Sequence, residues 1–393
     1  MPLQRALVLN AGSSTLKWSV LEARGGPRPL ALGTVEWQGF APERQAEQVQ
    51  AVLRGQAVAG SAQAVGHRVV HGGTAFRGPV RITAAVREAL AAVAEIDPLH
   101  IPAALAGIDA VTAAAPHLPQ VAAFDTSFHT TLPEAAACYP VPWEWTERYG
   151  LRRYGFHGLS VSYAARRVAA LLGTAPRRLL VCHLGSGCSL TAVADGRSVD
   201  TSMGFTPLEG VMMATRSGSV DPGLLLHLQR RCGVGLDELE DGLQHRSGLA
   251  GVSGAGADLR QVLAAAARGS RRAALAYDLF VHSLVRTAGA MIAVLGGLDA
   301  LVLTGGIGER SAKLRADFLA RLVWAGVSLD PAANQAAAGD REISPAGAAV
   351  RAFTIAARED LAVLRDLLSV LAVEEEKPTA GQADDPTVTP AGG

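Results

Sequence analysis

Two segments of the sequence resemble each other, and this repeat constrains the fold more than any other feature. Residues 7–22 (LVLNAGSSTLKWSVLE) and 179–196 (LLVCHLGSGCSLTAVADG) each contain an apolar run, a Gly/Ser-rich turn and a second apolar run. Each predicts a β-hairpin whose tip offers backbone N–H groups and hydroxyls, which can hold a phosphate. Two such hairpins at the starts of two half-chains indicate a duplicated domain gripping one nucleotide, although two unrelated hairpins would give the same pattern.

The rest of the chain alternates short β-rich runs with longer Ala/Leu/Arg-rich runs, which is typical of an α/β protein. We expect strands at 6–10, 64–71, 120–124, 178–183, 189–194 and 300–304. We expect helices at 85–94, 102–115, 161–172, 271–295, 311–325 and 359–373. Apolar side chains are spread around the helix at 271–295, which predicts a buried spine between layers.

The chain length indicates more than one domain. Its 393 residues are about two and a half times the size expected of a single domain. We expect an N-terminal lobe of residues 1–129 with 361–373 and a C-terminal lobe of residues 130–360. Residues 374–393 contain three prolines and few apolar residues, which predicts a disordered tail.

Composition excludes several classes of partner. The 36 basic residues balance 36 acidic ones, so nothing favours a nucleic-acid partner. The most apolar stretch, 287–298, spans about 12 residues, whereas a membrane span needs about 20. The first ten residues lack the apolar core of a secretory signal, and the four cysteines form no CxxC pair. We therefore expect a cytoplasmic protein without a membrane partner.

Common catalytic motifs are also missing from the sequence. It contains no Walker-type phosphate loop, dinucleotide fingerprint, protein-kinase HRD or DFG motif, or nucleophile elbow. His67 and His71 lie four residues apart in a predicted strand, so they would stand about 13 Å from each other. That separation is too large for one zinc ion.

What remains is a series of polar residues in Gly-rich or apolar segments. They are Asn10, Ser13, Thr15, Lys17, His67, Arg68, His71, His100, Asp125, His129, His157, His183, Arg216, Asp221, Glu359 and Asp360. Each alone has a structural explanation, since a single histidine in an apolar strand is usually a core group. Together they supply arginines, carboxylates for Mg²⁺ and backbone donors, which are the parts that phosphoryl transfer needs.

Seven segments then resemble, in order, the signatures of the acetate kinase (acetokinase) family. They are LNAGSSTLK, HRVVHGG, FDTSFH, YGFHG, TSMGFTPLEG, TRSGSVDP and GGIGE, within a match that runs from about Leu7 to Leu367. The resemblance implies two duplicated α/β domains of the actin/Hsp70/sugar-kinase (ribonuclease H-like) type around a central nucleotide cleft. This agrees with the hairpin repeat. The resemblance implies that the N-terminal lobe is the acyl-substrate and phosphate side and that the C-terminal lobe is the nucleotide side.

The resemblance also implies roles for residues at matching positions. The catalytic set would be Arg68, Asp125, His157 and Arg216. The acyl substrate would contact Arg68, Val70, Leu99, Phe156 and Pro207. The nucleotide would contact Asn10, Ser13, Thr15, Lys17, His183, Leu184, Gly185, Ser186, Gly187, Gly305, Gly306, Ile307 and Gly308. Asn10 and Glu359 would serve Mg²⁺, with Mn²⁺ as an alternative, and His100 matches a family histidine near the cleft. A homodimer is implied as well.

Some positions depart from the family pattern. Ser186 stands where Asn is usual, Cys188 replaces Ser, and Val161 replaces a histidine. Arg310 and Arg358 introduce charge near the expected nucleotide. These changes bear on efficiency and nucleotide selectivity more than on reaction type.

The function expected from these features is reversible transfer of the ATP γ-phosphoryl group to acetate, giving acetyl phosphate and ADP. The acceptor carboxylate is already an anion and needs no general base, and no residue stands out as an activated nucleophile, which favours direct in-line attack. Two alternatives stay open: a propionate or butyrate kinase with the same chemistry, and a non-catalytic nucleotide-dependent clamp. One methylene is worth only about 1–3 kcal/mol in discrimination, so the sequence does not separate the acids.

Overall fold

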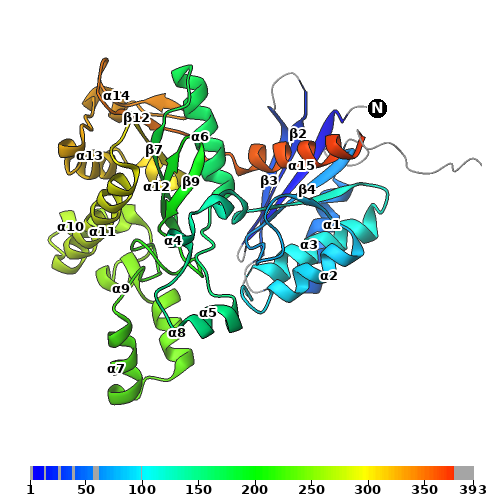
Figure 1. Ribbon diagram of the computed structural model, residues 1–393, viewed down its shortest axis with the longest axis horizontal. Helices are drawn as coiled ribbons and strands as arrows, with labels where there is room; N and C mark the ends of the chain where they lie inside the picture. The colour runs from blue at the N-terminus through cyan, green and yellow to red at the C-terminus, as the bar shows by residue number, and fades with distance from the viewer. Residues whose placement is uncertain are drawn as a thin grey trace, which may run out of the picture.

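Two six-stranded sheets form the framework of the protein (Figure 1). The computed structural model describes residues 3–12, 15–24, 28–37, 40–55, 62–98 and 100–375. The first sheet has the order β3-β2-β1-β4-β6-β5. Its strands are β1 (Arg5–Ala11), β2 (Thr15–Glu22), β3 (Arg28–Glu36), β4 (Ala64–Val69), β5 (Val80–Arg81) and β6 (Gln120–Phe124).

The second sheet repeats this topology strand for strand, with the order β11-β12-β10-β7-β8-β9. Its strands are β7 (Arg178–Leu184), β8 (Cys188–Ala194), β9 (Arg197–Thr201), β10 (Ala300–Thr304), β11 (Arg341–Glu342) and β12 (Arg351–Thr354). In each sheet three antiparallel strands are followed by two parallel ones and a short antiparallel edge strand. The predicted duplication is thus present, and the two similar sequence segments form the matching β1–β2 and β7–β8 hairpins.

Alternation along β1 explains how helices cover both faces of the first sheet. Leu7 and Leu9 pack into the cluster formed with α1 (Pro42–Arg54) and α3 (Ile101–Ala114), whereas Ala6 and Val8 pack against α15 (Glu359–Glu375). Since successive strand side chains point to opposite faces, an apolar run of this kind requires cover on both sides. Figure 1 shows α15 on one side of the sheet and α1, α2 (Ala84–Val93) and α3 on the other.

The second sheet is covered in the same way. On β7, Leu179 and Val181 pack with α6 (Gly158–Leu172), whereas Leu180 and Cys182 pack with α11 (Arg271–Leu295). Two further helices, α10 (Leu259–Ala267) and α13 (Ala312–Ala320), lie on the α11 side. The remaining helices are η1 (Ser127–Thr131), α4 (Glu134–Ala137), α5 (Trp143–Tyr149), α7 (Pro222–Cys232), α8 (Leu236–Gln244), α9 (Gly248–Ser253), α12 (Gly305–Arg310), η2 (Val323–Ala325) and α14 (Pro331–Gln335).

Helices α6 and α15 pack against each other between the sheets. A glycine allows α15 to approach its sheet closely, because a Cβ on Gly66 would lie 2.6 Å from Cγ1 of Val363. The chain therefore crosses from the second sheet back to the first along α15. Where the two lobes divide, at 129/130 and 360/361, stays a prediction.

Helix α11 is, among the described helices, long and apolar enough to cross a membrane by length and composition alone. One side of it, including Ala276, Phe280 and Leu284, is buried in the core of the second sheet. The other side exposes 49% of Leu275 and 41% of Leu279. The helix is therefore a core helix with one open face, and the expected burial between layers holds only for the side that packs into the core.

The six predicted strands and six predicted helices all exist, with corrections at their ends. The strand expected to reach His71 ends at Val69. The helix expected at 311–325 is broken: α13 ends at Ala320, and Leu322 leaves the helical region with φ −109° while its side chain is fully buried. The expected tail begins too early, because residues 374 and 375 still belong to α15, where no helix breaker stands before Pro378. Residues 376–393 lie outside the described part.

Candidate active site

A cleft of about 570 Å³ opens where the two sheets face each other. Residues from both hairpins, from the ends of β4 and β10, and from the start of α15 line it. Of the predicted residues these are Asn10, Thr15, Lys17, Arg68, His157, His183, Gly185, Ser186, Gly187, Gly305, Gly306 and Glu359. The predicted Ser13 and Leu99 lie outside the described residues.

Three neighbouring parallel strands of the first sheet bring polar groups to one edge. Asn10 pairs in register with Arg68 across β1 and β4, and Asp125 directly follows β6. The carboxyl ends of parallel strands meet at the same edge of a sheet, where α/β proteins commonly bind ligands. These three residues are separated along the chain, and the parallel pairing of their strands brings their side chains together.

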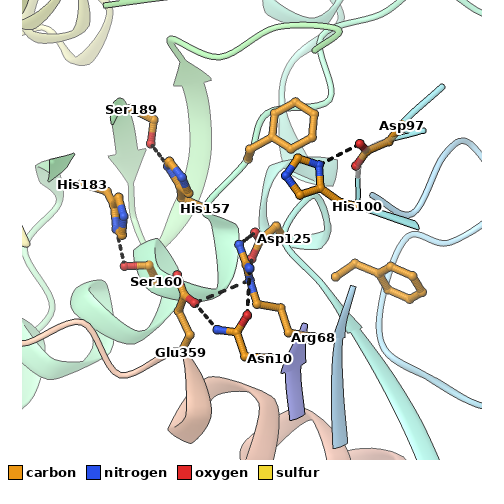
Figure 2. Close-up of polar contacts among 12 residues, drawn as sticks. Asn10, Arg68, Asp97, His100, Asp125, His157, Ser160, His183, Ser189 and Glu359 are labelled. Carbon is orange, nitrogen blue, oxygen red and sulfur yellow. Dashed lines mark hydrogen bonds and ion pairs between the residues drawn. The ribbon is translucent and has the colours of Figure 1, made fainter. Parts of the chain in front are cut away.

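Arg68 is the centre of a hydrogen-bonded cluster (Figure 2). Its Nε donates to Oδ1 of Asp125 at 3.3 Å, its Nη2 pairs with Oδ2, and its Nη1 donates to Oδ1 of Asn10 at 2.9 Å. Oε2 of Glu359 lies 3.5 Å from Nε of Arg68 and accepts from Nδ2 of Asn10 at 2.8 Å. The guanidinium is thus fixed by three side chains from three separate segments.

Charge and burial oppose each other in this cluster. Burial raises the pKa of Asp125 to about 6, against the effect of Arg68, so the carboxyl is ionised at neutral pH. Burial acts to lower the pKa of Arg68, but Asp125 and Glu359 outweigh it, and the pKa lies above its ordinary value. For Glu359, burial acts to raise the pKa, but Arg68 and the hydrogen bond from Asn10 hold it below its usual value. All three groups therefore carry their charges at pH 7.

Two stacked imidazoles face this cluster. The ring of His157, which precedes α6, stacks on His183 of β7 with centroids 4.1 Å apart and an interplanar angle of 27°. Burial lowers the pKa of both histidines, His157 the further because His183 and Arg68 add to the effect. Both rings are neutral at pH 7, and neither supplies a charge.

The position of His157 depends on a glycine. A Cβ on Gly158 would lie 2.1 Å from the carbonyl oxygen of Asp125, so only glycine lets α6 begin against the end of β6. His157 itself adopts φ 59°, one of two described non-glycine residues with positive φ. Strained backbone of this kind persists where surrounding contacts enforce it and is frequent at active sites.

Arg216 approaches the same place from the second lobe. A Cβ on Gly187 would lie 3.4 Å from the His157 ring and 3.5 Å from Nη1 of Arg216, so the three residues meet. Nη1 of Arg216 also donates to the carbonyl oxygen of Pro207 at 3.2 Å. Burial lowers the pKa of Arg216 from its ordinary value, which leaves it fully cationic at neutral pH.

The residues expected around the acyl group adjoin these catalytic candidates. Val70 lies two residues after Arg68, and Phe156 directly precedes His157; both belong to one buried cluster. Pro207 is tied to the site through its bond with Arg216. The structure therefore brings together the described members of the predicted acyl pocket.

A second cavity of about 280 Å³ shares Gly185, Ser186 and Gly306 with the cleft. Its walls add apolar side chains and charged groups, namely Leu259, Leu263, Ile307, Asp258, Arg260, Arg310 and Ser311. The chain turns sharply here, since Gly305 has φ 78° and a Cβ on it would lie 2.8 Å from the Leu184 carbonyl oxygen. This cavity is mostly apolar and adjoins the polar cleft along the residues that the two share.

Two predicted nucleotide residues lie behind the loop and line neither cavity. Leu184 is fully buried in the core, and a Cβ on Gly308 would meet its side chain at 3.7 Å. They support the loop by packing. His100 caps the start of α3 and bonds Oδ1 of Asp97 through Nδ1 at 2.8 Å, close to but not lining the cleft.

Comparison with known proteins gives the same family as the sequence motifs. The acetokinase family model matches residues 54–365. The chain belongs to the acetokinase family. It is 44% identical over 398 residues to the acetate kinase of Gloeobacter violaceus, covering 92% of this chain and 98% of that relative.

Two solved structures superpose on nearly the whole acetokinase chain. The acetate kinase of Porphyromonas gingivalis matches with a TM-score of 0.84 at 32% identity, covering 94% of this chain and 100% of that one. A propionate kinase of Francisella tularensis matches with a TM-score of 0.84 at 34% identity, covering 93% and 99%. These similarities confirm the predicted fold class and the predicted enzyme: a phosphotransferase of the acetate kinase type that acts on a carboxyl group.

Acetokinases use ATP and a divalent metal, and the donor set of this chain is compatible with such an ion. The described residues contain no cluster of three or more His, Cys, Asp or Glu side chains that would enclose a metal. Mg²⁺ usually binds one or two carboxylates, several waters and substrate phosphates, so a cage is not required. Glu359 lines the cleft, and its Oε1 has no hydrogen-bond partner in the described part of this acetokinase.

Sequence reasoning missed several residues of this acetokinase site. The strand β3 contributes Gly33 and Thr34 to the cleft wall, and the sequence singled out neither. Arg358 and Asp360, which the sequence singled out without a specific role, also line the cleft and bond each other. Two buried serines that bond the histidines were also missed; they are Ser160 and Ser189. Ser189 was a usable signal, since it lies inside the apolar strand β8 and a buried polar residue there needs a partner.

Other polar candidates have structural roles. His67 bonds Gln120, and His129 bonds Ser198 and the Phe156 carbonyl, all within the core. Asp221 caps α7. These side chains therefore bond within the core or cap a helix, as is usual for a single polar group in an apolar segment.

Proposed function

We propose that this acetokinase transfers the γ-phosphoryl group of ATP to acetate, reversibly and by direct in-line attack. A carboxylate oxygen forms a bond to the γ-phosphorus while the bond from that phosphorus to the β,γ-bridging oxygen breaks, and ADP leaves. The observation that carries this proposal is the pair of guanidiniums that act on the neutral His157: Arg68 in the cleft wall and Arg216 beside the cleft glycine Gly187.

The chemistry explains why the site is rich in cations and lacks a general base. The acceptor is already an anion, so the main difficulty is bringing two anions together and stabilising the spread charge of the transferring group. Arg68 is pre-oriented by Asp125 and Asn10, so it need not reorganise during the reaction. His157 would donate a hydrogen bond to an equatorial oxygen, and Arg216 would neutralise charge from the other side.

The nucleotide would extend across the two connected cavities. Its base and ribose would occupy the cavity beside Leu259 and Ile307, and its phosphates would run past Gly185–Gly187 and Gly305 into the cleft. Lys17 and Thr15 on the first hairpin would contact the terminal phosphate. Closure of the two lobes would exclude water and suppress ATP hydrolysis.

Asn10 and Glu359 would serve Mg²⁺, with Mn²⁺ as the alternative. When bound, the ion would neutralise phosphate charge and help to orient the phosphates. Nδ2 of Asn10 donates to Oε2 of Glu359 at 2.8 Å, which keeps the carboxylate at the cleft wall. Glu359 thus links Arg68 on the acceptor side with the phosphate side.

Acetate is proposed as the acceptor because Val70, Phe156, Pro207 and Leu99 match the small apolar pocket of the family. A longer acid is the second candidate, favoured by the similarity to a propionate kinase of the same fold. The test is acyl-phosphate formation, trapped as hydroxamate, with acetate, propionate and butyrate, with and without Mg²⁺. The highest kcat/KM with acetate supports the proposal; a higher value with propionate or butyrate transfers it to that acid. ATP-dependent assembly or peptide binding without any acyl phosphate favours a clamp and overturns it.

A homodimer and a cytoplasmic location belong to the same proposal. Exposed apolar side chains gather on and beside α5, α7 and α8, which project together at one end of the second lobe in Figure 1; they are Val141, Trp143, Trp145, Tyr149, Val220, Leu224, Leu226 and Leu236. Exposed apolar clusters of this kind mark protein interfaces. Light scattering should give a mass near twice 40.6 kDa, falling to the monomer in Leu224→Glu/Leu226→Glu. All four cysteines are free, as in a reducing compartment.

A further inference from the structure

The two stacked histidines have the same kind of partner. Nδ1 of His157 lies 3.0 Å from Oγ of Ser189, and Nδ1 of His183 lies 2.8 Å from Oγ of Ser160 (Figure 2). Both serines are buried, with exposed fractions of 0% for Ser189 and 1% for Ser160. Each ring therefore has one nitrogen tied to a hydroxyl, and its Nε2 is free of the serine.

Each histidine–serine pair joins the start of α6 to the β7–β8 hairpin. The start of α6 supplies His157 and Ser160, whereas the β7–β8 hairpin supplies Ser189 and His183, which face each other in its ladder. Each element thus supplies one imidazole and one hydroxyl, and each imidazole bonds the hydroxyl of the other element. Neither ring can rotate without losing its partner on the other element, so the two bonds fix both ring planes.

Which group donates in these bonds depends on the acceptors that each serine hydroxyl can reach. A serine hydroxyl has one hydrogen, and when buried it needs an acceptor. Ser162, two residues after Ser160 on the same helix, donates to the carbonyl oxygen of Leu159 at 3.1 Å. Neither Ser160 nor Ser189 has a carbonyl or carboxylate acceptor among the described residues, so the imidazole nitrogen is the acceptor open to each.

We propose that Ser160 and Ser189 are positioning residues that donate to Nδ1 of His183 and His157 and thereby hold both rings in the Nε2–H tautomer. A neutral imidazole that accepts at Nδ1 must carry its proton at Nε2. Each ring then presents a neutral N–H toward the cleft. The assignment of this N–H to a phosphoryl oxygen rests on the proposed function.

The alternative states are unfavourable for an anionic ligand. With the proton on Nδ1, the lone pair of Nε2 would face the phosphate oxygens and repel them. A doubly protonated ring is opposed by burial and by Arg68 and Arg216, which hold the pKa of His157 far below its usual value. A donor without a charge is therefore available only through the tautomer that the serines select.

Nitrogen NMR of the protein labelled with ¹⁵N-histidine tests the tautomer directly. The wild-type spectrum should show Nε2 of His157 and His183 protonated and both Nδ1 atoms unprotonated at pH 7, assigned with His157→Gln and His183→Gln. Ser189→Ala should shift His157 toward a mixture of tautomers, and Ser160→Ala should do so for His183. A wild-type spectrum with the proton on Nδ1 of either ring overturns the proposal, whether or not the enzyme is active.

Kinetics supply the second measurement. Ser189→Ala and Ser160→Ala should each lower kcat about 10- to 100-fold with the KM values for ATP and the acid changed little, since the effect is on transition-state donation. Ser189→Thr, which keeps a hydroxyl in a strand position that favours branched side chains, should recover most of kcat. The matched control is Ser162→Ala, which removes a buried hydroxyl from α6 without touching a histidine and should leave kcat unchanged.

The outcomes separate this proposal from the proposed function. Full kcat in Ser189→Ala and Ser160→Ala, in proteins that melt within a few degrees of the wild type, overturns the positioning role. A wild type that forms no acyl phosphate overturns the proposed function instead, while the NMR result still decides the tautomers.

Discussion

The guanidinium of Arg68 and the carboxylate of Asp125 form a two-point pair at the ends of neighbouring parallel strands, with Nε donating to Oδ1 at 3.3 Å and Nη2 paired with Oδ2. Asp125 is 1% exposed, so the pair is shielded from solvent on the carboxylate side. An arginine held in this way presents its remaining N–H groups in one fixed direction.

Asp125→Asn should therefore impair catalysis by loosening Arg68. We expect kcat/KM for the acid to fall about 100-fold while the fold is kept, because one donor of Arg68 loses its charged acceptor. The matched control is Asp109→Asn, which breaks the same two-point geometry with Arg87 on the surface, where the two side chains are 49% and 41% exposed. Equal activity of the two variants would show that Asp125 does not position Arg68.

The same pair predicts an acid limb in the pH profile. Burial raises the pKa of Asp125 to about 6, so the carboxylate that holds Arg68 is charged at pH 7 and gains a proton as the pH falls through about 6. Protonation removes the charge that orients Arg68, and kcat/KM should decline on the acid side of that value. In Asp125→Asn the residual activity should lack this limb. A wild-type profile that stays flat down to pH 5 contradicts the assignment.

The resemblance to the family put Arg68 and Asp125 in one catalytic set, and the strand that ends before Asp125 was recognisable in the sequence. The parallel pairing of β4 and β6 then brings the two side chains together. The duplicated topology was predicted from the two similar hairpins. Patterns within a few residues thus predicted most of the fold, whereas the roles of the site residues came from the resemblance to the family.

Contacts between distant elements could not be predicted. Ser160 reaches His183 only because α6 begins against the end of β6, and this depends on the missing side chain of Gly158. The strand β3 was missed because its exposed, alternating residues give a weak apolar signal. Arg358 was noted only for its charge, since nothing in the sequence indicates that it bonds Asp360 at the cleft wall.

Arg216→Ala should nearly abolish transfer without unfolding the protein. Arg216 lies beside His157 and Gly187, both of which line the cleft, and from there it would stabilise the charge of the group in transfer. Loss of an arginine in this role typically costs about 10³-fold or more in kcat. Arg87→Ala on the surface is the control and should keep wild-type turnover. Turnover by Arg216→Ala within tenfold of the wild type would remove this arginine from the mechanism.

Glu359→Gln should change the metal requirement. Glu359 offers the cleft a carboxylate whose Oε2 is engaged by Asn10 and Arg68, and an amide is a much weaker ligand for Mg²⁺. We expect the Mg²⁺ concentration for half-maximal activity to rise about tenfold or more at saturating ATP. Asp109→Asn, far from the cleft, should leave the Mg²⁺ titration unchanged. An unaltered titration in Glu359→Gln means that other groups hold the ion.

Arg315→Met should weaken both the fold and the nucleotide site. Arg315 is 1% exposed and donates to the carbonyl oxygens of Gly308, Glu309 and Asn334, so it fixes the end of α12, whose first residues line both cavities. Removing it leaves three buried carbonyls without this donor, and we expect a loss of about 3 kcal/mol in the free energy of unfolding. The KM for ATP should rise more than the KM for the acid, because α12 lies on the nucleotide side.

The control for this variant is Arg272→Met. Arg272 also donates to two carbonyl oxygens, those of Val252 and Gly251, but it does so at the surface, where water replaces the lost bonds. Its unfolding free energy should change by less than about 1 kcal/mol, and its KM for ATP should match the wild type. If Arg315→Met and Arg272→Met behave alike, burial of the guanidinium does not determine how firmly α12 is held. The loop that carries Gly305 and Gly306 must then be fixed by its packing on β7 and β10 instead.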